Sequence, residues 1–220
     1  MSNFHSYKIS KHQYTIKHRP IKRLFDIVFS SLALLLLAPL FLSIALAIRL
    51  SSKGDAIYSH ARIGRGGKPF KCYKFRTMHP DADQRLQELL NKDSALREEW
   101  QNTRKLKRDP RITPIGAFLR KTSLDELPQF WNVLKGDLSV VGPRPVVEEE
   151  VIQYLGIKAV KILSMRPGIT CIWQVSGRND TSYHRRIELD EKYVDNHSML
   201  LDMKLIAKTI PSMISSKGAY

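Results

Sequence analysis

The chain has 220 residues, of which 43% are apolar, and its 36 lysines and arginines outnumber its 21 aspartates and glutamates, giving a formal net charge of +15. This length and apolar content can supply one principal domain with its own core. Cys72 and Cys171 lie far apart and match no zinc-ligand spacing, which favours a reducing compartment and argues against a zinc site. The charge indicates an anionic partner, either nucleic acid, an acidic membrane surface or a phosphorylated substrate.

A long hydrophobic segment follows a basic stretch at residues 1–20. Residues 27–48 carry no charge and would reach roughly 33 Å as a straight helix, enough to cross a bilayer. Basic residues dominate both flanks, so both ends are expected on the cytoplasmic side. Pro39 near the centre breaks or kinks a helix. We therefore predict a re-entrant helix-break-helix over residues 21–50; a single spanning helix with a tolerated proline is the alternative.

Residues 51–220, which include the adjacent acids Asp125 and Glu126, are predicted to form the catalytic domain, on the cytoplasmic face. The stretch AIYSHARIGRGGKPFKCYKFRTM indicates a β-hairpin, in which Gly64, Gly66 and Gly67 supply positive φ angles and GRGG is a basic turn rather than a phosphate loop. Apolar periodicity predicts a packing helix over 83–108 and further helices over 123–135, 146–163, 183–195 and 198–214. The last of these is expected either at a membrane interface or on an ordinary core.

Two adjacent carboxylates, Asp125 and Glu126, follow a Thr-Ser pair in KTSLDELPQ. Ser123 with Glu126 forms a capping-box pattern at a helix start, which explains the pair without catalysis. The functional alternative is that a carboxylate at a helix N-terminus stays ionised and attacks a phosphorus atom, forming an acyl phosphate. That attack needs counter-charge from a divalent metal together with arginine or lysine.

Several basic residues in constrained loops are candidates for this counter-charge. Arg144 stands between two prolines, which hold its backbone extended beneath a guanidinium suited to bidentate phosphate binding. A solvated surface turn is the alternative. Arg166 in MRPGIT and Arg178 in SGRND lie in similar contexts, and KFRTM adds Lys74 and Arg76. Together these loops predict phosphate handling.

The sequence resembles a known family. KRLFDIVFSSLALLLLAPLFLSIALAIRL, YKFRTM, LRKTSLDELPQFWNVLKGDLSVVGPRP, RPGIT and VSGRN occur in this order in bacterial polyprenyl-phosphate sugar-phosphate transferases, the monotopic phosphoglycosyl transferases. The resemblance covers about residues 20 to 215. It implies transfer of a sugar 1-phosphate, of hexose type, from a UDP-sugar to undecaprenyl phosphate with release of UMP, the first membrane step of O-antigen, capsule, exopolysaccharide or glycoprotein glycan assembly.

The resemblance also implies roles for individual residues. Asp125 would be the nucleophile that forms a phosphosugar-enzyme intermediate, and Glu126 its partner in the catalytic pair. Magnesium is implied as the cofactor, with Asp125, Glu126 and Asp202 as its acidic ligands. Arg120 and Arg144 would contact phosphate and Arg178 would lie near the nucleotide.

We therefore expect an α/β fold with mostly helical content, a monotopic membrane domain with interfacial amphipathic helices, at the cytoplasmic face of the bacterial inner membrane. The expected partners are the UDP-sugar, undecaprenyl phosphate, membrane lipids and, as an open possibility, a second copy of the chain. A non-enzymatic basic module that binds anionic lipids is the competing hypothesis. A nucleic-acid partner is not expected, because no RRM, zinc-finger or basic-zipper pattern is present.

Overall fold

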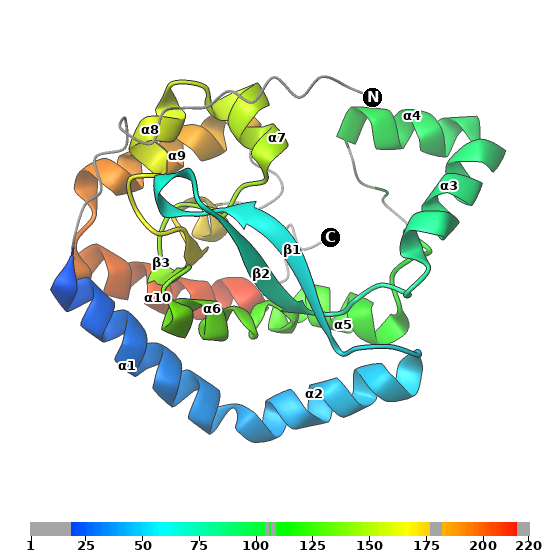
Figure 1. Cartoon of the computed structure of the whole chain (residues 1–220), viewed down its shortest axis with the longest axis horizontal. Helices are drawn as coiled ribbons and strands as arrows, with labels where there is room; N and C mark the ends of the chain where they lie inside the picture. The colour runs from blue at the N-terminus through cyan, green and yellow to red at the C-terminus, as the bar shows by residue number, and fades with distance from the viewer. Residues whose placement is uncertain (1–18, 104–105, 107–108, 177–181, 215–220) are drawn as a thin grey trace.

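The computed structural model describes residues 19–103, 106, 109–176 and 182–214, so the basic stretch before residue 19 and Arg178 lie outside the described residues. The described chain is mostly helical, as predicted, with two small two-stranded sheets (Figure 1). Its helices are α1 Pro20–Leu36, α2 Ala38–Ser51, α3 Ala82–Lys92, α4 Ser94–Thr103, α5 Pro114–Thr122, α6 Gln129–Lys135, α7 Glu148–Glu150, α8 Lys158–Ile162, α9 Tyr183–Asn196 and α10 Met199–Ile214. The strands are β1 Ile57–Ile63, β2 Pro69–Phe75, β3 Ser139–Val141 and β4 Gly168–Thr170.

The hydrophobic segment forms a bent helix pair, which confirms the predicted break. Helices α1 and α2 meet at Leu37 with a bend of 61°, forming the lower edge of the molecule in Figure 1. Pro39, in the first turn of α2, has no N–H to donate to Leu35, so the α1 hydrogen-bond ladder cannot continue. In the described chain no single helix has the length and composition to cross a bilayer, whereas the bent pair taken together does.

Helix α1 has its polar face inside and its apolar face outside. Its buried residues are Lys22, Asp26 and Ser30, spaced four apart on one side. On the opposite side Leu24 is 64% exposed and Leu35 is 72% exposed. A helix of a water-soluble domain shows the reverse arrangement, so the surroundings of α1 are not those of an ordinary surface helix.

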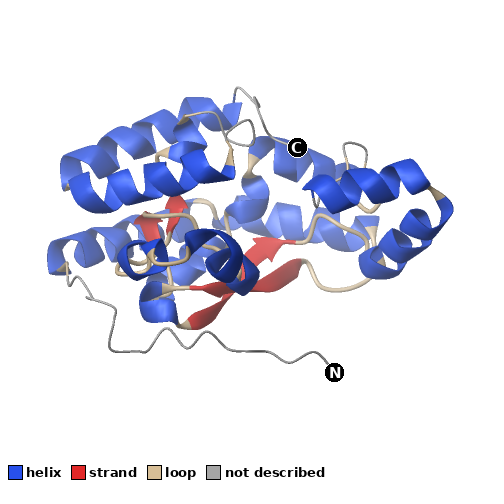
Figure 2. Cartoon of the chain, turned by 90° about the horizontal axis from the view of Figure 1, so that it is seen from above, coloured by secondary structure: helices blue, strands red, loops and turns tan. Residues whose placement is uncertain are grey.

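The predicted hairpin is confirmed. Strands β1 and β2 pair antiparallel, from Ile57 opposite Phe75 to Ile63 opposite Pro69. In the connecting turn Gly66 and Gly67 adopt φ angles of 70° and 71°, which favour glycine. Gly64 differs from the prediction, because its φ of −104° is extended. The second sheet pairs β3 and β4 in parallel. In Figure 2 the β1–β2 hairpin lies at one edge of the molecule with helices on one side of it.

The predicted packing helix over 83–108 is instead a helical hairpin, α3 and α4, that stands away from the body (Figure 1). The break occurs at Asp93, whose backbone is extended and whose carboxylate accepts hydrogen bonds from the Ala95 and Leu96 N–H groups. Within the described apolar stripe of this hairpin only Leu86 is buried. Little of the stripe therefore reaches the main core.

The main core joins the hairpin, the parallel sheet and the C-terminal helices. Its buried side chains come from β2, α6, β3, α9 and α10 and include Cys72, Val133, Val141, Tyr193 and Leu205. Two of the other predicted helices are interrupted: 123–135 is divided at Leu127 and Pro128, and 146–163 is divided into α7, a π-helical turn over Val151–Leu155, and α8. The helices predicted over 183–195 and 198–214 are confirmed as α9 and α10. A second cluster packs α2 against β2 and α5, which ties the bent pair to the domain.

Candidate active site

Strand β2 carries Lys74 toward the acidic pair. Asn132 of α6 is fully buried and fastens the strand, because its side chain accepts a hydrogen bond from the Tyr73 N–H and donates one to the Lys71 carbonyl. These two hydrogen bonds fix the position of β2 relative to α6. Since side chains alternate along a strand, Lys74 lies on the opposite face from Tyr73.

A sharp backbone turn delivers the acidic pair. Ser123 has a φ of 57° and forms the left-handed C-cap of α5, its N–H donating to the Arg120 carbonyl. One 3₁₀ turn, Leu124–Glu126, follows at once. The predicted capping box is wrong, because the Ser123 side chain caps no helix start. The acids are held by a tight turn, and Asp125 is buried within it.

Lys74 lies between the two carboxylates. Its Nζ is 2.6 Å from Oε1 of Glu126 and 3.7 Å from Oδ2 of Asp125. Burial raises the pKa of Asp125 to about 6, against the attraction of Lys74. For Glu126 burial also disfavours the charge, but the attraction and hydrogen bond of Lys74 outweigh it, so its pKa lies below the usual value. The helix-start effect expected to keep Asp125 ionised is therefore outweighed by burial.

Arg120 and Arg144 enter the same cavity from two further elements. Arg120, in the last turn of α5, donates through Nε to Thr77 Oγ1 over 2.9 Å. Helix α5 approaches this closely because Gly116 has no side chain; a Cβ there would lie 2.0 Å from the Thr77 carbonyl oxygen. The guanidinium of Arg144 lies 5.1 Å from the ring centroid of Trp173. Two arginines are thus fixed at the border of the cavity.

The cavity has a volume of about 700 Å³ and two unlike walls. One wall is polar and includes Asp125, Glu126, Lys74, Arg62, Arg120 and Arg144. The other is apolar and includes Phe29 of α1 and Ile206 and Ile210 of α10. Such a cavity accommodates a ligand with a phosphorylated end and a hydrocarbon end.

Two predicted residues do not join the pair, and a third is not described by the structure. The Arg76 side chain borders the cavity, but its guanidinium donates to the carbonyls of Ser52 and Lys53 after α2, so it fastens the helix pair to the hairpin. Asp202 does not line the cavity: its carboxylate is bound to Lys22 at 2.7 Å and to the Tyr193 hydroxyl at 2.7 Å. Arg178 lies outside the described residues.

Sequence reasoning missed residues that support Arg144. Asp190 is buried, and its carboxylate oxygens lie 3.4 Å from the Arg144 backbone nitrogen. Burial raises the pKa of Asp190 to about 7. Trp173, which stacks against the Arg144 guanidinium, is a neighbour of RPGIT in the chain. No sequence pattern marks either residue, because each acts through a contact with a distant segment.

Asp125 and Glu126 are suitable ligands for magnesium without a third acidic residue. Within the residues that the structure describes, no three His, Cys, Asp or Glu side chains gather as a metal site. Mg²⁺ is commonly bound through one or two carboxylates together with substrate phosphates and water. Asp125 and Glu126, open to a cavity of phosphate-binding size, fit that pattern. Asp202 is not required for it.

Comparison with known proteins places this site in a family. The bacterial sugar transferase family matches residues 17–216. The chain is 50% identical over 206 residues to the exopolysaccharide production protein ExoY of Rhizobium meliloti, covering 92% of this chain and 91% of that protein.

Two longer relatives carry more explicit names. The undecaprenyl-phosphate galactose phosphotransferase of Salmonella typhimurium is 46% identical over 202 residues. The UDP-glucose:undecaprenyl-phosphate glucose-1-phosphate transferase of Escherichia coli is 39% identical over 210 residues. Each match covers 92% of this chain and 42% of the relative, so the chain spans less than half of those proteins. Because the family match extends over nearly the whole chain, the chain belongs to the bacterial sugar transferase family and is a transferase.

Proposed function

We propose that this enzyme transfers a hexose 1-phosphate from a UDP-sugar to undecaprenyl phosphate and releases UMP, through a phosphosugar bound to Asp125. The observation that carries the proposal is the pairing of Asp125 and Glu126 around Lys74 in a cavity with one basic and one apolar wall. Relatives named as galactose and glucose phosphotransferases acting on undecaprenyl phosphate support the choice of acceptor and of a hexose. Exopolysaccharide assembly is the proposed use of the product, by analogy with ExoY.

The reaction divides into two displacements at one phosphorus atom. A carboxylate oxygen of Asp125 attacks the phosphorus that carries the sugar, the bond from that phosphorus to the bridging oxygen breaks, and UMP leaves with that oxygen. An oxygen of the lipid phosphate then attacks the same phosphorus. The bond to Asp125 breaks and its carboxylate is restored. Each step exchanges one P–O bond for another, so no external proton is required.

The cations in the cavity reduce the repulsion between anions in both steps. Lys74 holds Glu126 at 2.6 Å and lies 3.7 Å from Asp125, so its charge also offsets that of a phosphate attacked by Asp125. Arg120 and Arg144 provide planar donors for phosphate oxygens from the α5 side and the Trp173 side. A raised pKa leaves Asp125 more basic, and hence more nucleophilic, than an exposed aspartate.

Magnesium is proposed as the cofactor, held by Asp125 and Glu126 together with phosphate oxygens of the donor. When bound it neutralises charge on the phosphates and polarises their oxygens. The protein's own contribution is a tight turn that keeps both carboxylates within reach of Lys74. This assignment accounts for two acids beside a phosphate site without requiring Asp202.

We place α1 and α2 in the cytoplasmic leaflet of the bacterial inner membrane as a re-entrant pair. The support is the apolar outer face of α1, its polar inner face and the 61° bend. Phe29 of α1 and Ile210 of α10 border the reaction cavity, so a polyprenyl chain can lie in hydrocarbon while its phosphate reaches Asp125. Membership of a transferase family favours this enzyme over the non-enzymatic lipid-binding module.

The test is the intact mass of the detergent-solubilised chain after incubation with magnesium and individual UDP-sugars, without lipid acceptor. We expect a gain of one hexose phosphate with one donor, and no gain for Asp125→Asn, whose turnover should fall by about 10³-fold or more. Asp55→Asn makes the same change at an exposed position and should retain the adduct. UMP release only after undecaprenyl phosphate is added, with no adduct, would replace the covalent intermediate with direct transfer.

A further inference from the structure

Gln129 is a buried residue whose side chain borders the reaction cavity. It is the first residue of α6, it is only 2% exposed, and it belongs to the lining of the cavity. Among the residues that the structure describes, no group forms a hydrogen bond with its side-chain amide. A buried amide without a partner costs free energy, which a bound group with matching donors and acceptors recovers. The amide is therefore a candidate for contact with the substrate.

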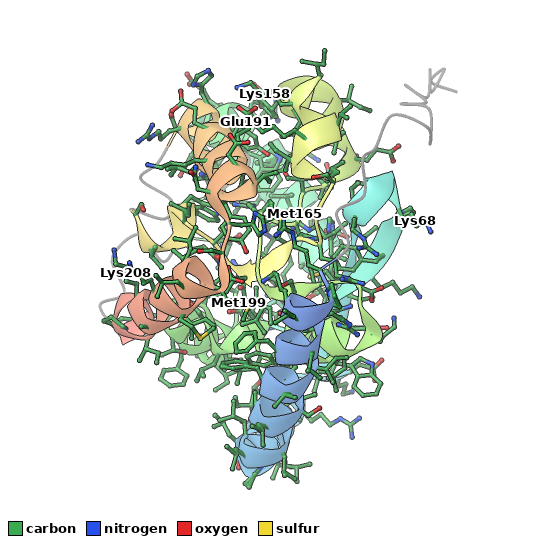
Figure 3. All side chains as sticks on the ribbon, turned by 90° about the vertical axis from the view of Figure 1, so that its left-hand side faces the viewer. Lys68, Lys158, Met165, Glu191, Met199 and Lys208 are labelled. Atoms are coloured by element: carbon green, nitrogen blue, oxygen red, sulfur yellow. The ribbon has the colours of Figure 1, made fainter. Side chains whose placement is uncertain are left out.

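The other buried hydroxyl side chains of the cavity wall, within the described chain, are already bonded to the protein. Thr77 Oγ1 accepts a hydrogen bond from Arg120 Nε at 2.9 Å. Thr170 Oγ1 lies 2.6 Å from the hydroxyl of Thr209, which α10 places on the cavity side. Figure 3 shows Lys208 of the same helix at the outer edge of the molecule, away from the cavity. The unpaired amide at the start of α6 thus differs from these hydroxyls.

The backbone holds Gln129 one helical turn after Asp125. The 3₁₀ turn that carries the acids continues into α6 through Leu127 and Pro128, which both have right-handed helical backbone angles. Side chains three or four residues apart in such a backbone are neighbours, with Cβ atoms roughly 5–6 Å apart. Asp125 and Gln129 both line the cavity accordingly. A sugar attached to the phosphorus that Asp125 attacks would lie beside the amide.

The amide offers a hydrogen-bond acceptor as well as donors. Its Nε2 group donates and its Oε1 accepts. A diphosphate without a proton offers acceptors only, and Lys74, Arg120 and Arg144 are available to it as cationic donors. Sugar hydroxyls both donate and accept, so they can satisfy both ends of the amide. The chemistry of the side chain therefore favours the sugar over the phosphates.

We propose that Gln129 binds the hydroxyl-bearing edge of the transferred sugar, with Oε1 accepting from one hydroxyl and Nε2 donating to that hydroxyl or its neighbour. The proposal rests on the proposed function, because the attack by Asp125 places the sugar. It makes Gln129 a substrate-binding residue that determines specificity. A donor that lacks the contacted hydroxyl leaves a buried amide unpaired, and the site rejects it for that reason.

The test is kcat/KM for UMP release from the preferred UDP-hexose and from analogues that each lack one sugar hydroxyl, with magnesium and undecaprenyl phosphate. Wild type should lose about 10- to 100-fold when a contacted hydroxyl is missing. Gln129→Met keeps the length of the side chain without its hydrogen bonds. It should be slower with the intact donor by a similar factor and should no longer distinguish that donor from the analogue. Gln101→Met makes the same change at an exposed position on α4 and should discriminate as wild type does.

Thermal unfolding without substrate separates this role from a structural one. Gln129→Met removes no side-chain hydrogen bond within the described chain, so its melting temperature in detergent should equal or exceed that of wild type. A lower melting temperature together with wild-type discrimination among the donors would show that Gln129 supports the fold, and would overturn the proposal.

Two other results would also overturn it. If Gln129→Met is slower with every donor by one factor, while each analogue keeps its wild-type ratio to the intact donor, the amide contacts a phosphate oxygen. If only the KM for undecaprenyl phosphate rises, the amide contacts the acceptor.

The assay also distinguishes this proposal from the proposed function. UMP is released whether transfer passes through the Asp125 adduct or occurs directly, so absence of the adduct leaves the comparison of donors intact. Equal rates of wild type with the intact donor and with every analogue would contradict the Gln129 contact and leave the transferase reaction standing. No UMP release from any donor would contradict the proposed function and the contact with it.

Discussion

Asp125 and Glu126 are neighbours in the chain, but their carboxylates have different surroundings. Glu126 has Lys74 at 2.6 Å, whereas Asp125 has the same amine at 3.7 Å and is buried. Glu126 is thus neutralised by a direct ion pair, whereas Asp125 carries a charge that burial separates from water. This difference assigns the nucleophile to Asp125 and the support of Lys74 to Glu126 in the proposed mechanism.

The charge on Asp125 should weaken the fold above pH 6. Burial raises its pKa from 3.8 to about 6, so the folded state holds the proton more tightly than the unfolded state and loses stability as the pH rises between these values. Asp125→Asn removes the charge and keeps the shape. We expect it to raise the free energy of unfolding at pH 8 by about 1–3 kcal/mol, and to have no such effect near pH 4. Thermal unfolding in detergent at both pH values measures this.

Asp55→Asn serves as the control for the pH measurement, because Asp55 is exposed. It should change the melting temperature at neither pH. If Asp125→Asn is no more stable than wild type at pH 8, burial does not destabilise the charged form of Asp125. The proposal that Asp125 is an unusually basic nucleophile would then be contradicted.

At the scale of elements, α1 is joined to the domain by polar contacts. Asp26 accepts hydrogen bonds from the Ser139 hydroxyl and the Val140 N–H, and so holds the helix against β3. These contacts are buried, which makes their loss costly. The polar inner face thus attaches the helix and leaves its apolar face exposed on the outside.

Asp26→Ala should lower the free energy of unfolding by about 3 kcal/mol, because it leaves a buried N–H and a hydroxyl without their acceptor. Asp26→Asn keeps an acceptor oxygen and should lose less. Melting temperatures in one detergent compare the two, with Asp55→Ala as the exposed control. Equal losses for the alanine and asparagine variants would show that the charge, rather than the hydrogen bonds, attaches α1.

At the scale of the whole molecule, the proposed re-entrant placement makes the bend between α1 and α2 decide on which side of the membrane the two ends lie. Pro39→Ala restores an N–H that can donate to Leu35 and removes the ring clash. A straight helix over Pro20–Ser51 would reach about 48 Å, more than the hydrocarbon core of a bilayer. We therefore expect the variant to place its two ends on opposite faces in a large share of the molecules.

Labelling by a membrane-impermeant maleimide measures this topology. Cysteines introduced by Ser10→Cys and Lys53→Cys flank the pair, and the native Cys72 and Cys171 are buried. In the wild-type background both introduced cysteines should label from the same side of oriented vesicles. If the two cysteines of the wild-type background are labelled from opposite sides of the vesicles, the re-entrant placement is contradicted. If both cysteines of Pro39→Ala are still labelled from the same side, the proline does not cause the bend.

The sequence by itself determined the features that depend on near neighbours in the chain. The uncharged run with its central proline predicts the helix break, because a missing N–H acts within one turn. The glycines of GRGG predict the hairpin turn through the φ angles at Gly66 and Gly67. Asp125 and Glu126 are adjacent in the chain, and the family resemblance predicts their roles. These effects are local, so a single sequence contains them.

Only the tertiary structure decided which distant side chains meet. Lys74 reaches the acids from a strand about 50 positions earlier, whereas Arg76, two residues on, turns back to the carbonyls after α2. Asp202 pairs with Lys22 from 180 positions away and does not join the acidic pair. The α3–α4 hairpin likewise stands apart although its apolar stripe predicted packing. Periodicity and charge indicate which side chains need a packing or charge partner. The packing of remote elements determines which partner each one has, because contact energies depend on distances that the chain order does not specify.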